Sequence, residues 1–141
     1  MKKGYFGKFG GMFVSELLVK PLQEVTAAFE NFKKNRLAQK ELKKLLRDYV
    51  GRPTPLYHAK NLSKKFGFNL FLKREDLIHG GAHKTNNTVG QAFLAKQMGK
   101  CELIAETGAG QHGFAVALAG ALSKIPVKIF MGEKDIGRQR M

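Results

Sequence analysis

The sequence predicts an α/β fold in which N-terminal helices precede βαβ units of a parallel sheet. Before residue 50, apolar residues recur at spacings of three and four, which is typical of helices. Later, short apolar runs at 68–73, 102–106 and 127–131 indicate strands. Segments of helical character, 85–98 and 111–122, separate these runs. This alternation predicts two βαβ units with right-handed crossovers.

The first fifty residues predict an arm and two helices. Residues 1–14 are rich in Gly and Phe and are expected to be ordered only when packed on something else. A helix is predicted from Pro21, because proline fits a first helical turn, and a second helix over about 39–49. The apolar stripe of the first helix, expected to face the core, consists of Leu22, Val25, Phe29 and Phe32. The stripe of the second consists of Leu42, Leu45, Leu46 and Tyr49.

Residues 51–76, between the predicted N-terminal helices and the first candidate site, contain paired prolines and a run of charges. The paired prolines in 51–55 predict an extended loop. A short helix over 61–66 is expected to end at Gly67. The run Lys73-Arg74-Glu75-Asp76 closes the strand over 68–73, and its charges are expected to pair with one another.

Length and charge limit the classes of protein that the chain can represent. With 141 residues, 43% hydrophobic, it can build one core and at most a single domain. The formal net charge of +14 could indicate a nucleic-acid partner. Interleaved leucines instead favour an amphipathic helix with a solvated basic face, so nucleic-acid binding is the less favoured interpretation. The basic residues concerned are Lys33, Lys34, Arg36, Lys40, Lys43, Lys44 and Arg47.

Cysteine content and hydropathy predict a soluble cytoplasmic protein with no membrane partner. The single Cys101 cannot form an internal disulfide, and its apolar neighbours predict a buried or partly buried thiol. The glycines after Met1-Lys2-Lys3 interrupt any signal-peptide core, and no apolar run is long enough to span a membrane. The sequence also predicts no metal site.

A first candidate site surrounds Lys84. Gly80, Gly81 and Ala82 precede it and let the backbone approach a ligand closely, and a helical segment follows. The partial positive charge of a helix N-terminus disfavours a second cation and so favours the neutral amine, the form that attacks an aldehyde. A solvated lysine at a loop–helix junction is the alternative for Lys84 alone. His83 beside it could bind an anion or cap a turn.

A second candidate site follows the predicted strand over 102–106. Glu106 ends this strand, at the edge where open α/β sheets place their chemistry. Gly108 and Gly110 free backbone N–H groups to converge on an anion, and the next helix N-terminus favours a carboxylate or phosphate. A tight turn beside a solvated glutamate is the alternative. Loops 80–84 and 107–112 are expected on the same side of the sheet, where one ligand could span both.

Several long segments carry a resemblance to a known family. They are residues 10–14, 51–56, 73–77, 81–87 and 105–113. In this order and combination they resemble the β chain of tryptophan synthase, a pyridoxal-phosphate enzyme of fold type II. The resemblance covers essentially the whole chain and implies the N-terminal portion of a longer one. It implies a division into residues 1–50, an arm and helices, and 51–141, an incomplete α/β cofactor-binding portion.

The resemblance also implies a reaction and a site. The enzyme would use pyridoxal 5′-phosphate to join L-serine and indole, giving L-tryptophan and water. Lys84 would bind the cofactor and take the α-proton of serine, and Glu106 would be the acid–base group. His83 would lie against the cofactor phosphate and Asn87 near the ring oxygen. The substrate carboxylate would be held by Thr107, Gly108, Ala109, Gly110, Gln111 and His112. The implied partners are a tryptophan synthase α chain and a second β chain, in an α2β2 complex.

Two alternatives to this function stay open. The first is a truncated, non-catalytic remnant that binds an α chain or a complementary fragment, since no Gly-rich phosphate cup occurs in the sequence. Enzymatic activity that does not rise after mixing with the α chain, together with retained α-chain binding, would favour this alternative. The second is another fold type II enzyme, such as a threonine synthase or a serine dehydratase, which the segment 83–87 disfavours. Ser15, Ile78 and Gly80 depart from the Pro, Asn and Thr common in the family.

Overall fold

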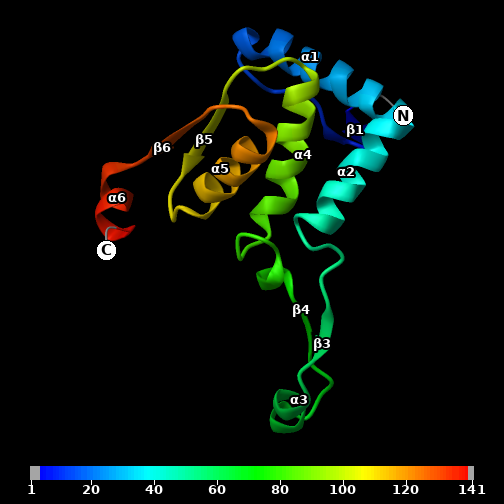
Figure 1. The fold of residues 1–141 in the computed structure, drawn as a ribbon, viewed down its shortest axis with the longest axis vertical. Coiled ribbons are helices and arrows are strands. Elements are labelled where there is room, and N and C mark those ends of the chain that lie inside the picture. Colours follow the sequence, from blue (N-terminus) through cyan, green and yellow to red (C-terminus); the bar gives the residue numbers. More distant parts are fainter. Residues whose placement is uncertain (1–3, 140–141) are drawn as a thin grey trace.

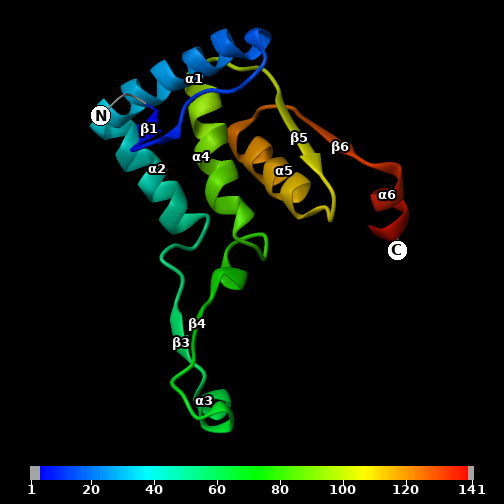
Figure 2. The ribbon, with the colours of Figure 1, turned by 180° about the vertical axis from the view of Figure 1, so that it is seen from behind.

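The computed structural model describes residues 4–139 as packed helices with a small parallel sheet on one side. Helices α1 (Glu16–Lys34) and α2 (Arg36–Asp48) pack against α4 (Lys84–Gln97), which packs against α5 (Gln111–Ser123). Strands β5 (Leu103–Thr107) and β6 (Val127–Met131) also pack on α5, and α6 (Glu133–Gln139) follows them (Figure 1). A hairpin of β3 (Leu56–His58) and β4 (Phe71–Lys73) projects from this body, with α3 (Lys60–Phe66) at its tip (Figures 1 and 2).

The structure contains the second predicted βαβ unit, and the prediction of the first, over 68–106, was wrong. Strands β5 and β6 pair in parallel across α5, from Leu103 opposite Val127 to Thr107 opposite Met131. Strand β4 instead pairs antiparallel with β3, with Leu56 opposite Lys73. Residues 51–55 form the predicted loop, and the strand β3 that follows it, for which no prediction was made, pairs with β4. The two strands are connected by residues 59–70, which contain α3 and its C-cap residue Gly67 at a φ of 75°.

The N-terminal helix differs from its prediction in start and exposure. It begins at Glu16, so Pro21 lies inside it, where a proline removes one backbone donor. Leu22, Val25 and Phe29 remain exposed, so the expected core-facing stripe was wrong except at Phe32, which is half-buried. The predicted arm contains a small hairpin of β1 (Tyr5–Phe6) and β2 (Phe9–Gly10), while residues 1–3 lie outside the described part.

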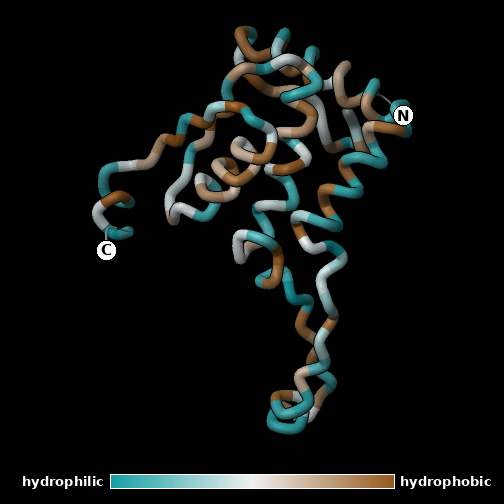
Figure 3. The backbone as a smooth tube through the Cα atoms, in the orientation of Figure 1, coloured by the Kyte–Doolittle hydropathy of each residue, from teal (hydrophilic) through white to brown (hydrophobic). Residues whose placement is uncertain are grey.

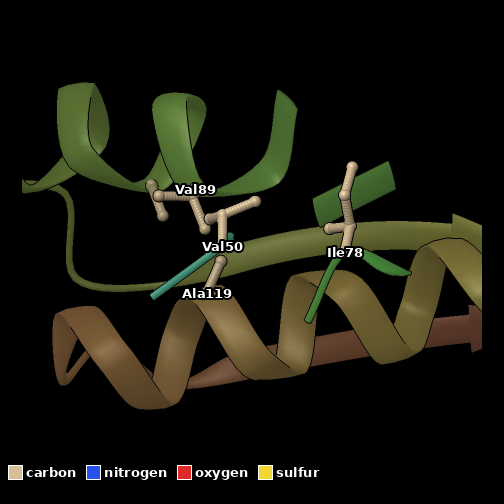
Figure 4. Packing of buried hydrophobic residues seen from close by; sticks show 5 residues of the cluster. Val50, Ile78, Val89 and Ala119 are labelled. Atoms are coloured by element: carbon tan, nitrogen blue, oxygen red, sulfur yellow. The ribbon is translucent and has the colours of Figure 1, made fainter. Parts of the chain in front are cut away.

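The hydrophobic core lies between α2, α4 and α5. Val50, Val89 and Ala119 point toward one another (Figure 4). Ile78, from the loop before α4, belongs to the same cluster and lies beside another part of α5. The predicted stripe of α2 is confirmed, because Leu42, Leu45, Leu46 and Tyr49 all pack against this cluster. The core therefore joins the chain just before the proline loop to the two helices that follow the candidate sites.

Ile78→Ala is expected to lower the free energy of unfolding by about 2–4 kcal/mol, because Ile78 is only 2% exposed and its removal leaves a cavity. Urea denaturation of both chains measures the change. Ile104→Ala is the matched control, since Ile104 is 67% exposed, and it should stay within about 0.5 kcal/mol of the wild type. Equal losses in both variants would contradict the proposed core.

The prediction of a solvated basic face is confirmed, whereas the prediction of a buried cysteine thiol was wrong. The seven basic residues of 33–47 are all exposed, and Figure 3 shows α2 alternating between hydrophilic and hydrophobic positions while α5 is mostly apolar. Cys101 is exposed, so its expected burial was wrong. It lies in the connection between α4 and β5. Within residues 4–139, no helix has the length and apolar character needed to cross a membrane.

Candidate active site

The loop before Lys84 is fixed to the core by its own backbone. It runs from the 3₁₀ helix η1 (Glu75–Leu77) to α4. Ile78 inserts into the core, the His79 N–H donates to the Val50 carbonyl at 3.1 Å, and the Gly81 N–H donates to the Ile78 carbonyl at 2.7 Å. These contacts hold the loop against the end of α2.

Gly80 brings the same loop against α5. Its φ is +94°, and a Cβ at this position would lie 2.9 Å from Leu118 Cδ1 and 3.0 Å from Thr85 Oγ1. Both the backbone conformation and the space therefore require glycine.

Lys84 is the first residue of α4 and is half-buried. Its side chain has no hydrogen bond or ion pair to any residue of 4–139. His83 is the N-cap residue without a side-chain capping bond, and Asn87 lies one turn further on, on the same helical face as Lys84. His83 and Asn87 are exposed. The first predicted cluster is thus assembled around one unpaired amine.

Glu106 lies on the face of the sheet that α5 leaves uncovered. It is the penultimate residue of β5, directly opposite Phe130, and is exposed. Its side chain has no partner among the described residues. Thr107, the next residue, faces α5 and is 5% exposed; its Cγ2 lies 3.0 Å from where a Cβ on Gly113 would be. The Thr107 side chain therefore serves packing.

The turn after β5 presents an uncapped helix N-terminus. Gly110 is the N-cap residue of α5 at a φ of 87°, with no side-chain hydrogen bond. Gly108 and Ala109 complete the turn, and Gln111 is exposed. The Nδ1 atom of His112 is buried yet has no hydrogen-bond partner within residues 4–139. Free backbone N–H groups and this unpartnered nitrogen make the turn receptive to an anion.

The structure brings the two predicted clusters to one end of the α4–α5 pair. Both helices begin at the same end in Figures 1 and 2. The Thr88 hydroxyl of α4 donates to the Ala115 carbonyl of α5 at 3.0 Å, one turn in from each N-terminus. No hydrogen bond or ion pair joins Lys84 to Glu106 among the described residues. A Cβ on Gly80 would lie 3.5 Å from Phe114 Cε1, so the 80–84 loop approaches the first turn of α5, whereas Glu106 lies on the sheet face that α5 leaves uncovered.

A network around Glu75 was missed by sequence reasoning. Its carboxylate accepts hydrogen bonds from Thr54 Oγ1 at 2.6 Å, Asn86 Nδ2 at 2.9 Å and Arg52 Nη1 at 3.0 Å. The expected pairing within the run 73–76 was right only for Arg74 and Asp76, 2.7 Å apart. Arg52 and Glu75 lie in two of the segments that carry the family resemblance, 51–56 and 73–77, and this was the sequence feature that could have indicated the network.

The pH dependence of stability should reveal the Glu75 network. The hydrogen bond from Thr54, with further contributions from Asn86 and Arg52, lowers the pKa of Glu75 despite its partial desolvation. A lowered folded-state pKa means stabilisation that is complete above the ordinary glutamate pKa of about 4.3 and is lost as pH falls through the folded-state value. The stability difference between wild type and Glu75→Gln should therefore be constant near neutral pH and narrow in acid. Urea denaturation from pH 7 to pH 3 tests this, and a pH-independent difference would contradict it.

Comparison with known proteins identifies the family. Residues 48–141, more than half of the chain, match the family described as "Pyridoxal-phosphate dependent enzyme". The chain therefore belongs to this family of enzymes. More particularly, it is a homologue of tryptophan synthase beta chains.

Two relatives show the extent of this homology. The tryptophan synthase beta chain of Campylobacter jejuni (strain 81-176) is 56% identical over 141 residues, covering 100% of this chain and 36% of the relative. Tryptophan synthase beta chain 1 of Methanosarcina acetivorans is 55% identical over 139 residues, covering 99% and 34%. The chain thus spans about a third of the length of the curated relatives it matches.

The residues present fit pyridoxal phosphate. The cofactor carries an aldehyde and a phosphate, and its amino-acid substrates carry a carboxylate. Lys84 offers an unpaired amine for the aldehyde, and the uncapped N-terminus of α5 with the unpartnered His112 Nδ1 offers donors for an anion. The donor set at this end of the helix pair therefore matches the chemical groups of the cofactor and substrate.

Proposed function

We propose that this chain supplies the lysine-bearing part of a tryptophan synthase of the β-chain type, joining L-serine and indole to give L-tryptophan and water. The observation that carries the proposal is the half-buried, unpaired Lys84 at the same end of two packed helices as the anion-receptive turn 107–112. The homology to tryptophan synthase beta chains supports the choice of reaction.

Each predicted residue has a role in this proposal. Pyridoxal 5′-phosphate, when bound, supplies an electron sink for the substrate amino acid. Lys84 binds the cofactor and takes the proton from the serine α-carbon. Glu106 would give a proton to the departing β-hydroxyl and help position indole, which requires the substrate to reach the sheet face that α5 leaves uncovered. His83 would hold the phosphate and Asn87 would lie near the ring oxygen. The carboxylate is held by Thr107 through its backbone and by Gly108, Ala109, Gly110, Gln111 and His112.

The proposal extends to partners and location. A tryptophan synthase α chain would deliver indole, and two β chains would pair within an α2β2 complex in the cytoplasm. These assignments follow the resemblance to β chains, and no nucleic-acid or membrane partner is proposed.

Chemical mapping of the cofactor lysine tests the proposal. The chain is mixed with pyridoxal phosphate, reduced with borohydride and digested, and the modified peptides are identified by mass spectrometry. Reduction should fix the cofactor on Lys84 far above its level on exposed lysines such as Lys96. An even distribution over the lysines would refute the proposed cofactor site.

A second candidate function, binding without catalysis, is favoured by the uncovered face of the β5–β6 sheet. Ile104 is 67% and Phe130 54% exposed on this face, whereas parallel sheets are normally covered on both faces. The chain would then bind an α chain or a complementary fragment. Retained binding in a sedimentation assay, with no tryptophan formed from serine and indole after mixing, would favour this candidate.

A further inference from the structure

We infer that Glu75 is the positioning residue for Lys84, holding the first turn of α4 through Asn86; this inference rests on the proposed role of Lys84. Glu75 lies nine residues before the lysine, on the far side of the glycine loop.

The network closes the lysine loop at its base. Asn86 Nδ2 donates to Glu75 Oε2 at 2.9 Å across eleven positions of the chain. The intervening segment contains η1, the two glycines, His83 and Lys84. A side-chain bond between the ends of a loop reduces the conformations available to everything between them. Lys84 lies inside this closed segment, two residues from its end.

Arg52 makes the arrangement a closed ring. Its Nη1 donates to Glu75 Oε2 at 3.0 Å and to Asn86 Oδ1 at 3.1 Å. Both ends of the Asn86 amide are therefore used, its oxygen by a cation and its nitrogen by an anion. Thr54 Oγ1 adds a bond to the other carboxylate oxygen at 2.6 Å. The ring joins the proline loop, η1 and the start of α4.

Helical geometry transmits this constraint to the lysine. Successive residues of an α-helix are rotated by about 100°, so Asn86 and Lys84 project to nearly opposite sides of the first turn. Fixing Asn86 fixes the rotation of that turn and so the direction of the lysine stem. The first turn of α4 has no acidic residue and no side-chain cap of its own. The Glu75 carboxylate thus brings from outside the negative charge that a helix N-terminus favours.

A polarity swap tests the inference. Glu75→Gln removes the negative charge and one of the two acceptor oxygens on which three donors converge, and Asn86→Asp places two carboxylates in contact, so each single variant weakens the ring. In the double variant, the new amide at position 75 can donate to the new carboxylate at position 86, which also accepts from Arg52. The bond that closes the loop is then restored with its charges exchanged, and a specific pair should show strong coupling. Asp76→Asn is the control, because the Asp76 side chain pairs with Arg74 and, within residues 4–139, with no member of the Glu75 network.

Hydrogen exchange in the absence of cofactor gives the first readout. Each single variant should raise amide exchange in residues 78–87 by about tenfold relative to 111–123, and the double variant should restore it. The yield of borohydride-fixed cofactor on Lys84, relative to Lys96, should follow the same pattern. Unchanged exchange in the single variants, or equal loss over 111–123 without rescue, would overturn the inference. If the wild-type chain fixes no cofactor on Lys84, the proposed function fails, while the exchange data still decide whether Glu75 orders the segment.

Discussion

Lys84→Ala is expected to abolish the reducible cofactor adduct of the chain. Only a primary amine can condense with the cofactor aldehyde, and Lys84 is the half-buried amine left unpaired at the start of α4. The absorbance band that forms with pyridoxal phosphate, and the product fixed by borohydride, should both fall to background. Lys84→Arg should behave in the same way, because a guanidinium keeps the charge without offering a reactive amine.

Lys96→Ala is the matched control for this loss. Lys96 lies in the last turn of the same helix and is exposed, so its removal changes net charge and helix composition equally. Its adduct should equal that of the wild type. A band that survives Lys84→Ala, or one lost equally in Lys96→Ala, would show that cofactor capture is nonspecific.

Local sequence patterns predicted the helices and the β5–α5–β6 unit because their signals lie within one segment. The apolar run before Glu106 and the alanine-rich helix after Gly110 each fold on neighbouring residues, and β6 matched its predicted bounds, 127–131. The pairing of β4 was not predictable in this way. Its partner β3 had not been predicted as a strand, and the pairing joins residues that lie 13 to 17 positions apart in the chain.

The candidate site shows the same division between local and distant information. Loops 80–84 and 107–112 could be predicted because each contains glycines and is followed within a few residues by a helix start, and both signals are local. The Glu75 network could not, since it joins Arg52 to Glu75 across 23 positions and Asn86 to Glu75 across 11. Hydrogen bonds of this range leave no periodic pattern in the sequence. Sequence reasoning likewise placed Cys101 in an apolar neighbourhood without seeing that its turn lies outside the core.

Gly120→Ala is expected to destabilise the chain by about 3 kcal/mol, among the largest effects of a single methyl group. Gly120 is buried in α5, and an added Cβ would overlap Val127 Cγ2 and lie 2.9 Å from the Ile125 carbonyl oxygen. The methyl group cannot be relieved by a flexible side chain, because valine is stiff and the other neighbour is backbone. Urea denaturation measures the loss.

Gly90→Ala separates this steric effect from helix propensity. Gly90 lies inside α4 with nothing within 4 Å of an added Cβ, so alanine should stabilise the chain by up to about 1 kcal/mol. Equal stability changes at both glycines would contradict the close approach of α5 to β6. Because β5, α5 and β6 together position the turn 107–112, Gly120→Ala should also weaken anion binding there, whereas Gly90→Ala should leave it intact. The packing of one glycine against one valine thereby connects the small parallel sheet to the proposed carboxylate site.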